Sequence, residues 1–142
     1  MDKKYCAYLC SGCGIGDALD MDALAEVVTG EMSMDCKTAD CLCGADGRAL
    51  IEADVGEGVN TVVVGACSPR VMKNEFDFGD GTITLRANLR EQVVWAEVKP
   101  AEDEEPHAEA AEFLNETAAD YMRMACTQAQ KTEPPEPHKL EN

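Results

Sequence analysis

Residues 59–70 read VNTVVVGACSPR, and this stretch decides the fold class. The apolar run from Val62 to Ala66 lacks polar alternation, which is typical of a strand buried on both faces of a parallel sheet. Cys67 follows at once, and then Ser68 and Pro69 stand where a helix cap and a first helical residue would stand. The stretch therefore predicts a strand over 59–66 that leads into a helix directly after Cys67.

The sequence on either side repeats this alternation of strand and helix. Further strands are predicted over 4–9, 32–36 and 82–85. Further helices are predicted from about residue 21 to Gly30, over 46–55, and from Asn88 through about Val98. Asp17 or Asp20 caps the first of these helices and Asn88 the last. The pattern predicts an α/β fold with a small, mostly parallel sheet flanked by helices.

The composition changes after Pro100. An acidic linker over 102–105 is followed by a predicted helix from Pro106 to about residue 129, whose single apolar stripe is explained by packing against the sheet. Prolines 134, 135 and 137 then predict an extended, flexible tail. We therefore expect a domain over 1–100, a linker and C-terminal helix over 101–131, and a tail over 132–142.

The chain is strongly acidic, with 28 acidic and 12 basic residues among 142 and a net charge of −16. Such a surface repels phosphate backbones and anionic lipid, so we expect no nucleic-acid partner. The longest apolar stretch, Val62–Cys67, is far shorter than the roughly 20 residues of a spanning helix, so we expect no direct membrane insertion. His107 and His138 lie in polar stretches and are expected to be solvated surface residues.

Eight cysteines suggest metal or redox chemistry. The start MDKKYC has no apolar segment behind its lysines, so we expect a cytoplasmic location. In a reducing compartment, cysteines are better explained by metal ligation or thiol chemistry than by a disulfide framework.

Four of these cysteines are predicted to share one site. Cys10 and Cys13 follow the first strand in the turn CSGCGIG, Cys43 precedes the helix over 46–55, and Cys67 ends the strand over 59–66. Carboxyl ends of parallel strands meet at one edge of a sheet, where α/β ligand sites are built. Helix N-termini and free turn amides there are expected to lower the pKa of the thiols. The remaining cysteines are Cys36, kept as a reserve ligand, and Cys6, Cys41 and Cys126, which we expect to be dispensable for the metal.

The spacing alone leaves three chemistries open. A C-x-x-C pair occurs in zinc sites and in iron–sulfur sites alike. The site could therefore hold a [4Fe–4S] cluster or a zinc ion that staples a protein-binding module. A thiol–disulfide oxidoreductase that uses Cys10 and Cys13 is the third possibility.

Several motifs together resemble one protein family. They are CSGCGIGDALD (10–20), VVVGACSPR (62–70) and ANLREQ (87–92), with CGADG (43–47) as a weaker fourth. In this order and spacing, the chain resembles the N-terminal domain of the A subunit of heterodisulfide reductase over roughly residues 3–130. It resembles still more closely the related flavoprotein subunit of the quinone-modifying oxidoreductase complex.

The resemblance implies a non-catalytic electron-transfer domain or subunit. It implies one [4Fe–4S] cluster on Cys10, Cys13, Cys43 and Cys67, and partners that are flavoprotein or iron–sulfur subunits of an oxidoreductase complex. Family members often have a cysteine in the segment that matches 92–95, whereas this chain has Val93, which cannot be a ligand. The sequence given stops at Asn142, where the family would open its flavin domain, so FAD is expected on a partner chain.

Overall fold

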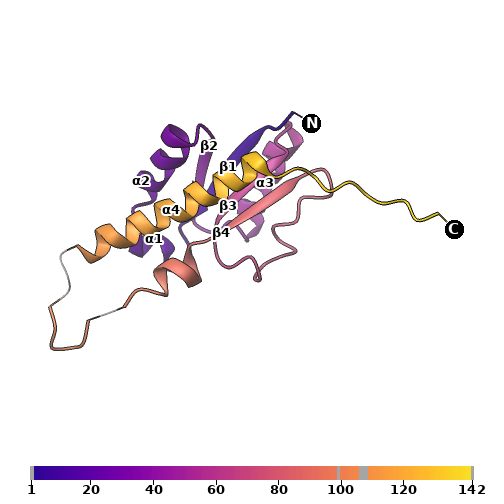
Figure 1. Cartoon of the computed structure of the whole chain (residues 1–142). Helices are drawn as coiled ribbons and strands as arrows, with labels where there is room; N and C mark the ends of the chain where they lie inside the picture. Colours follow the sequence, from indigo (N-terminus) through magenta and orange to yellow (C-terminus); the bar gives the residue numbers. More distant parts are fainter. Residues whose placement is uncertain (1, 99, 106–108, 142) are drawn as a thin grey trace.

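Four parallel strands form the centre of the computed structural model, which describes residues 2–98, 100–105 and 109–141 (Figure 1). The sheet has the order β2-β1-β3-β4, and each neighbouring pair is parallel. The predicted α/β fold with a parallel sheet and a C-terminal helix is confirmed. The strands are β1 (Tyr5–Cys10), β2 (Asp35–Ala39), β3 (Thr61–Ala66) and β4 (Ile83–Asn88).

Helices lie between the strands and after them. The carboxylate of Asp20 accepts a hydrogen bond from the Ala23 amide at 3.1 Å and so caps α2, as predicted. Pro106, where the last helix was predicted to begin, and His107 lie outside the described residues. The helical segments are α1 (Ile15–Ala18), α2 (Met21–Glu26), the π-helical turn η1 (Val27–Glu31), α3 (Ala45–Gly56), the π-helical turn η2 (Arg90–Val94) and α4 (Ala110–Lys131).

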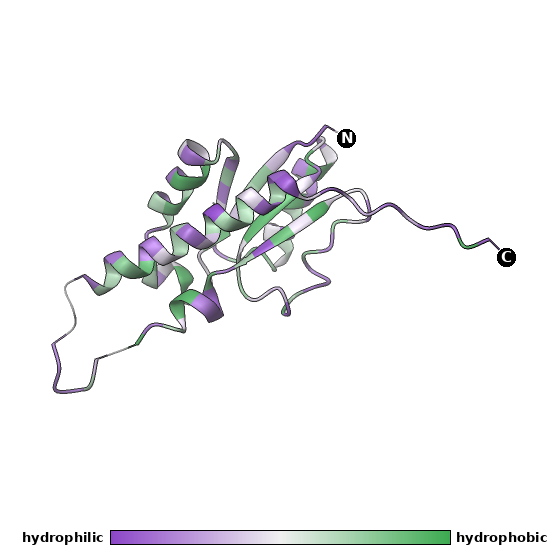
Figure 2. Ribbon diagram, viewed as in Figure 1, coloured by the Kyte–Doolittle hydropathy of each residue, from purple (hydrophilic) through white to green (hydrophobic). Residues whose placement is uncertain are grey.

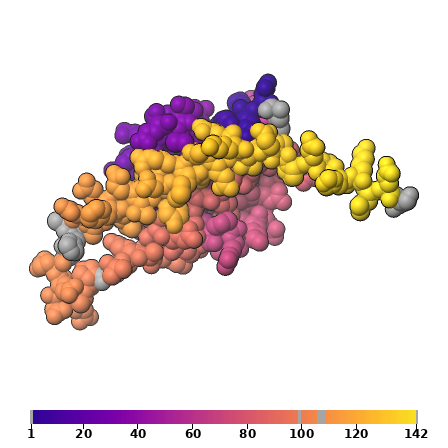
Figure 3. Space-filling model, viewed as in Figure 1, coloured from indigo at the N-terminus to yellow at the C-terminus, as the bar shows by residue number. Residues whose placement is uncertain are grey.

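Each face of the sheet has its own core, because alternate side chains of a strand point to opposite faces. On one face, Leu9 and Val63 pack under α2 and α4; on the other, Tyr8 and Val64 pack under α3 and the segment after β3. Helix α4 lies across the sheet, and the apolar colours of Figure 2 gather on the strands beneath it. Residues 132–141 form no helix or strand and project from the body (Figure 3).

The helix predicted after Cys67 does not form, and residues 67–82 make turns instead. The reason is that its first backbone groups are engaged elsewhere. The Ser68 amide donates to the Glu91 carboxylate at 2.6 Å, and the Arg86 guanidinium donates to the carbonyls of Cys67 and Ser68. Of these groups, a helix capped by Ser68 would use only the Ser68 carbonyl, which here accepts from the Val71 amide at 2.9 Å, as in a single turn, and also from Arg86. Side chains from β4 and η2 thus bind this segment as a turn.

Two further predicted boundaries were wrong. Strand β2 covers Asp35–Ala39 rather than 32–36, because pairing with β1 begins only where Cys6 meets Asp35. The helix predicted from Asn88 to about Val98 ends after one turn at Val94, although Asn88 Oδ1 does cap the Glu91 amide at 3.0 Å. Beyond that turn Val98 is 93% exposed, so no apolar face stabilises a longer helix.

A polar cluster at the β1–α3 contact gives a prediction on pH. Asp54 accepts hydrogen bonds from the Tyr8 hydroxyl at 2.7 Å and from Lys37 Nζ at 2.8 Å. Partial burial raises the pKa of the Asp54 carboxyl, but the bonds from Lys37 and Tyr8 outweigh it and lower that pKa overall. The ionised Asp54 carboxylate therefore stabilises the folded chain fully above the ordinary aspartate pKa of about 3.9. This stabilisation is lost as the pH falls through the lower pKa that Asp54 has in the folded chain.

Asp54→Asn should accordingly lower the free energy of unfolding by about 1 kcal/mol at pH 7. In urea unfolding, the difference from wild type should shrink as the pH falls below about 4. Asp103→Asn, in the exposed linker, is the matched control and should change little at either pH. An Asp54→Asn effect that stays constant between pH 7 and pH 3 would contradict this assignment.

Candidate metal centre

The strand order creates a crevice between β1 and β3. Strand β2, which follows β1 in the sequence, lies on one side of β1 in the sheet, and the later strands β3 and β4 lie on its other side. At such a switch point the connections leave in opposite directions, and ligands bind outside the carboxyl ends of the two central strands. Cys10 is the last residue of β1, Cys67 follows the last residue of β3, and both are 8% exposed.

The turn after β1 brings Cys13 to the same edge. Cys13 and Gly14 both have left-handed backbone angles, with φ of 54° and 82°. A non-glycine residue in this region is uncommon and is found most often at functional turns. Gly12 lets the turn after β1 lie against the segment that follows β2, because a Cβ at Gly12 would come within 2.2 Å of the Asp40 carbonyl oxygen. The first turn therefore depends on Gly12 and Gly14 to hold Cys13 in place.

Cys43 reaches the site from the loop that precedes α3. Gly47 in the first turn of α3 packs directly on this loop, since a Cβ there would lie 2.3 Å from the Cys41 carbonyl oxygen and 2.4 Å from Leu42 Cα. The Cys43 sulfur lies 3.6 Å from that of Cys41. Burial, together with the nearby thiols of Cys41, Cys10 and Cys67, raises the pKa of the Cys43 thiol to about 11. The expected lowering of this pKa by the helix N-terminus was therefore wrong.

The four predicted ligands line one cavity of about 50 Å³. A thiol held protonated by burial becomes a thiolate when a cation replaces its proton, so metal binding at Cys43 would release a proton. Among the described residues, no three histidine, cysteine, aspartate or glutamate side chains are grouped to hold a single metal ion. The other residues lining the cavity are Ile15, Ala66, Val71, Met72, Phe76 and Arg90.

Two arginines at the site were not predicted. Arg86 Nη2 donates to the Cys67 sulfur at 3.2 Å. Arg90 lines the cavity, donates through Nε to Glu91 at 2.5 Å and stacks on Trp95 with 4.6 Å to the ring centroid. Their positive charges suit an anionic, thiolate-bound group, so the donor set and its surroundings fit an iron–sulfur cluster. Neither contact has a sequence signal, because both depend on how β4 and η2 pack against the segment after β3.

The remaining cysteines lie elsewhere, except for Cys41. Cys36 lies near the start of the edge strand β2, where it pairs with Ala7. It is three residues, or about 10 Å of strand, before Ala39 at the end of β2. The structure therefore does not bring this reserve ligand to the cavity. Burial, together with the thiols of Cys6 and Cys126, raises the pKa of the Cys36 thiol to about 12. These three form part of the apolar packing, whereas Cys41 is exposed.

Combined replacement of Cys6, Cys41 and Cys126 should leave the metal content unchanged. We expect Cys6→Ala, Cys41→Ser and Cys126→Ala in one chain to keep the iron of wild type, because none of them lines the cavity. Stability should fall by about 1 kcal/mol for each of the two buried sulfurs that is removed. Iron analysis and urea unfolding measure the two effects, and loss of more than half of the iron would show that the ligand set is wrong.

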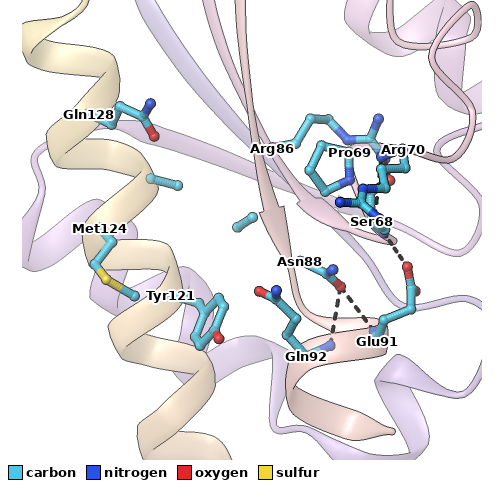
Figure 4. A pocket seen from close by; sticks show the side chains of 12 residues that line it. Ser68, Pro69, Arg70, Arg86, Asn88, Glu91, Gln92, Tyr121, Met124 and Gln128 are labelled. Carbon is cyan, nitrogen blue, oxygen red and sulfur yellow. Dashed lines mark hydrogen bonds between the residues drawn. The ribbon is translucent and has the colours of Figure 1, made fainter. Parts of the chain in front are cut away.

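A larger groove of about 570 Å³ lies on the other side of Arg86. Figure 4 shows Ser68, Arg70 and Arg86 on one side of β4, and Tyr121, Met124 and Gln128 of α4 on the other. The dashed bonds link Asn88 to the start of η2 and Glu91 to Ser68 at the edge of this groove. Arg86 lines the groove and also contacts Cys67, which lines the cysteine cavity.

None of the helices in the described ranges is long and apolar enough to cross a membrane. No family model matches the chain. The chain is 33% identical, over 94% of its length, to the A subunit of H(2):CoB-CoM heterodisulfide,ferredoxin reductase from Methanothermobacter thermautotrophicus. It is 30% identical, over 98% of its length, to the protein of the same name from Methanothermobacter marburgensis. It spans about a fifth of the length of these curated relatives, so the likeness is to one part of the A subunit of a heterodisulfide reductase.

Proposed function

We propose that this chain is an electron-transfer domain or subunit that carries one [4Fe–4S] cluster on Cys10, Cys13, Cys43 and Cys67. The observation that carries the proposal is that these four cysteines, from separate turns and strand ends, line one cavity. The cavity of about 50 Å³ is several times the roughly 10–15 Å³ that a single water needs. A space of this size between four thiols suits a polynuclear group better than one ion.

The residues around the cavity have distinct roles in this proposal. When bound, a [4Fe–4S] cluster supplies a one-electron redox centre. Val71, Met72 and Phe76 form an apolar wall that limits water, and such a wall influences a reduction potential. The guanidinium groups of Arg86 and Arg90 offset negative charge in a chain whose net charge is −16. No step of bond making is assigned to the chain, which would exchange electrons only with partners.

The likeness to the A subunit of heterodisulfide reductase supports a place in an oxidoreductase complex. We infer that the partners are flavoprotein or iron–sulfur subunits of a heterodisulfide-reductase-like or quinone-modifying complex. Cytoplasmic location is part of the same proposal.

Anaerobic purification tests the proposed cofactor. We expect a brown protein with about four iron atoms per chain, the content of one [4Fe–4S] cluster, and an electron paramagnetic resonance signal that appears on reduction. A colourless protein with one zinc per chain would replace the proposal with a zinc-stapled module. A metal-free protein whose Cys10 and Cys13 cycle with dithiols would replace it with a thiol–disulfide oxidoreductase.

Electron transfer to a partner should depend on salt. Residues 101–142 contain 11 acidic and 3 basic residues, and Glu112 and Glu116 are exposed on α4. Attraction to a basic partner surface is screened as the Debye length falls from about 10 Å at 0.1 M to about 3 Å at 1 M ionic strength. The rate of cluster reduction by the copurifying partner, followed by stopped flow, should therefore fall as salt rises.

The matched variant combines Glu112→Gln and Glu116→Gln with deletion of residues 132–142. It should flatten the salt dependence, whereas the potential of the cluster should not change. A wild-type rate that is indifferent to salt would remove the docking role of this acidic region.

A further inference from the structure

Arg86 is fixed in one orientation by its surroundings. Its Nη1 donates to the Val71 carbonyl at 3.1 Å, and its Nη2 to the carbonyls of Cys67 and Ser68 at 3.2 and 3.0 Å. The guanidinium also stacks on Phe76, with 4.3 Å to the ring centroid. A side chain held at four points loses little further entropy when it makes one more contact.

That further contact is to a predicted cluster ligand. Nη2 lies 3.2 Å from the Cys67 sulfur, within the range of an N–H···S hydrogen bond. No ion pair recorded among the described residues includes Arg86, so no carboxylate in that part of the chain lies within ion-pair distance of its guanidinium. Arginine stays protonated in proteins, so the positive charge is permanent.

We propose that Arg86 is a positioning residue that raises the reduction potential of the cluster through Cys67. This inference rests on the proposed function. Reduction places one more negative charge on the cluster and its thiolates, and a cation with an N–H directed at one of those sulfurs stabilises the reduced form more than the oxidised form.

The position of Arg86 on β4 directs its side chain to the face of the sheet that carries Cys67. Side chains of β4 alternate between faces, and Arg86 points to the face that carries Phe76 and Cys67, while Leu85 and Ala87 point into the opposite core. A purely structural role would be to clamp the turn after β3. Loss of the clamp alone lowers stability and cluster content but leaves the potential of the cluster that remains unchanged.

The test is a redox titration of the reconstituted full chain, followed by electron paramagnetic resonance. Arg86→Gln removes the charge and should make reduction at least about tenfold less favourable, which is 59 mV for one electron. Arg86→Lys keeps the charge and should restore part of this difference. Arg123→Gln, which removes an equal charge on α4 where Arg123 pairs with Glu31, should leave the potential unchanged.

An Arg86→Gln chain that keeps its cluster at the wild-type potential would overturn the inference and leave the proposed function intact. A wild-type chain that binds no cluster would instead overturn the proposed function itself. If the Arg86→Gln chain binds no cluster, a second measurement tests the inference. Arginine is labelled with ¹⁵N in a chain that keeps Arg86 and carries Arg90→Lys, so that Arg90, which also lines the cavity, gives no signal. The reduced cluster should then show hyperfine coupling to guanidinium ¹⁵N, and its absence would overturn the inference.

Discussion

Cys67→Ser is expected to remove most of the iron from the purified chain. A serine hydroxyl is a poor substitute for thiolate in an iron–sulfur site, and Cys67 is the predicted ligand that directly follows β3 at the switch point. Cys67 is the most informative of the four positions, because Cys43 has the Cys41 sulfur 3.6 Å away as a substitute. Iron analysis after anaerobic reconstitution, with the absorbance of the cluster, measures the effect.

Serine is nearly the size of cysteine, so the fold should survive this change. Urea unfolding of the metal-free variant should differ from wild type by about 1 kcal/mol or less, which separates loss of a ligand from loss of the fold. Cys126→Ser, at a fully buried position in α4, is the control and should keep its iron. Full iron content in Cys67→Ser would exclude Cys67 from the ligand set.

Gly47→Ala is expected to affect both stability and metal binding. The new Cβ would lie 2.3–2.4 Å from backbone atoms of Cys41 and Leu42, so the loop that carries Cys43 must move. Overpacking of this kind costs about 1–3 kcal/mol, and Leu42 is fully buried and resists displacement. We expect a loss of about 1–3 kcal/mol in urea unfolding of the metal-free chain, together with reduced iron content.

The same helix supplies the control for this experiment. Gly56 ends α3, and no atom lies within 4 Å of a Cβ added there. Gly56→Ala should therefore stabilise the chain by about 0.4–1 kcal/mol and leave the iron content unchanged. Equal stability of the Gly47→Ala and Gly56→Ala variants would show that the contact between α3 and the Cys41–Cys43 loop is not tight.

The sequence was most informative where packing repeats along the chain. The buried run in β3 and the cap at Asp20 were predicted correctly, because hydrophobic period and capping are local properties. The gathering of four cysteines at one edge followed from the direction of parallel strands. That placement is observed, whereas ligation of a cluster stays a prediction.

Prediction failed where side chains from distant segments compete for backbone groups. Ser68 and Pro69 look like the start of a helix, but only a turn forms there, and Arg86 and Glu91 bind the backbone of Cys67 and Ser68. The same competition places Arg86 on the sulfur of Cys67. A tertiary contact of this kind has no period or local motif, so it could not have been predicted from one sequence.

Lys3 ties the end of α4 to the start of β1, since its Nζ donates to the carbonyls of Ala129 and Gln130 at 3.2 and 3.1 Å. The tail over 132–141 therefore leaves from the pole of the molecule opposite the cysteines. Strand β1 is only about 20 Å long, whereas this segment, fully extended, spans at most about 33–36 Å. A partner bound to the tail would thus stay within reach of the end of the molecule that holds the cysteine cavity, which raises its effective concentration there. The tail itself would leave that end uncovered.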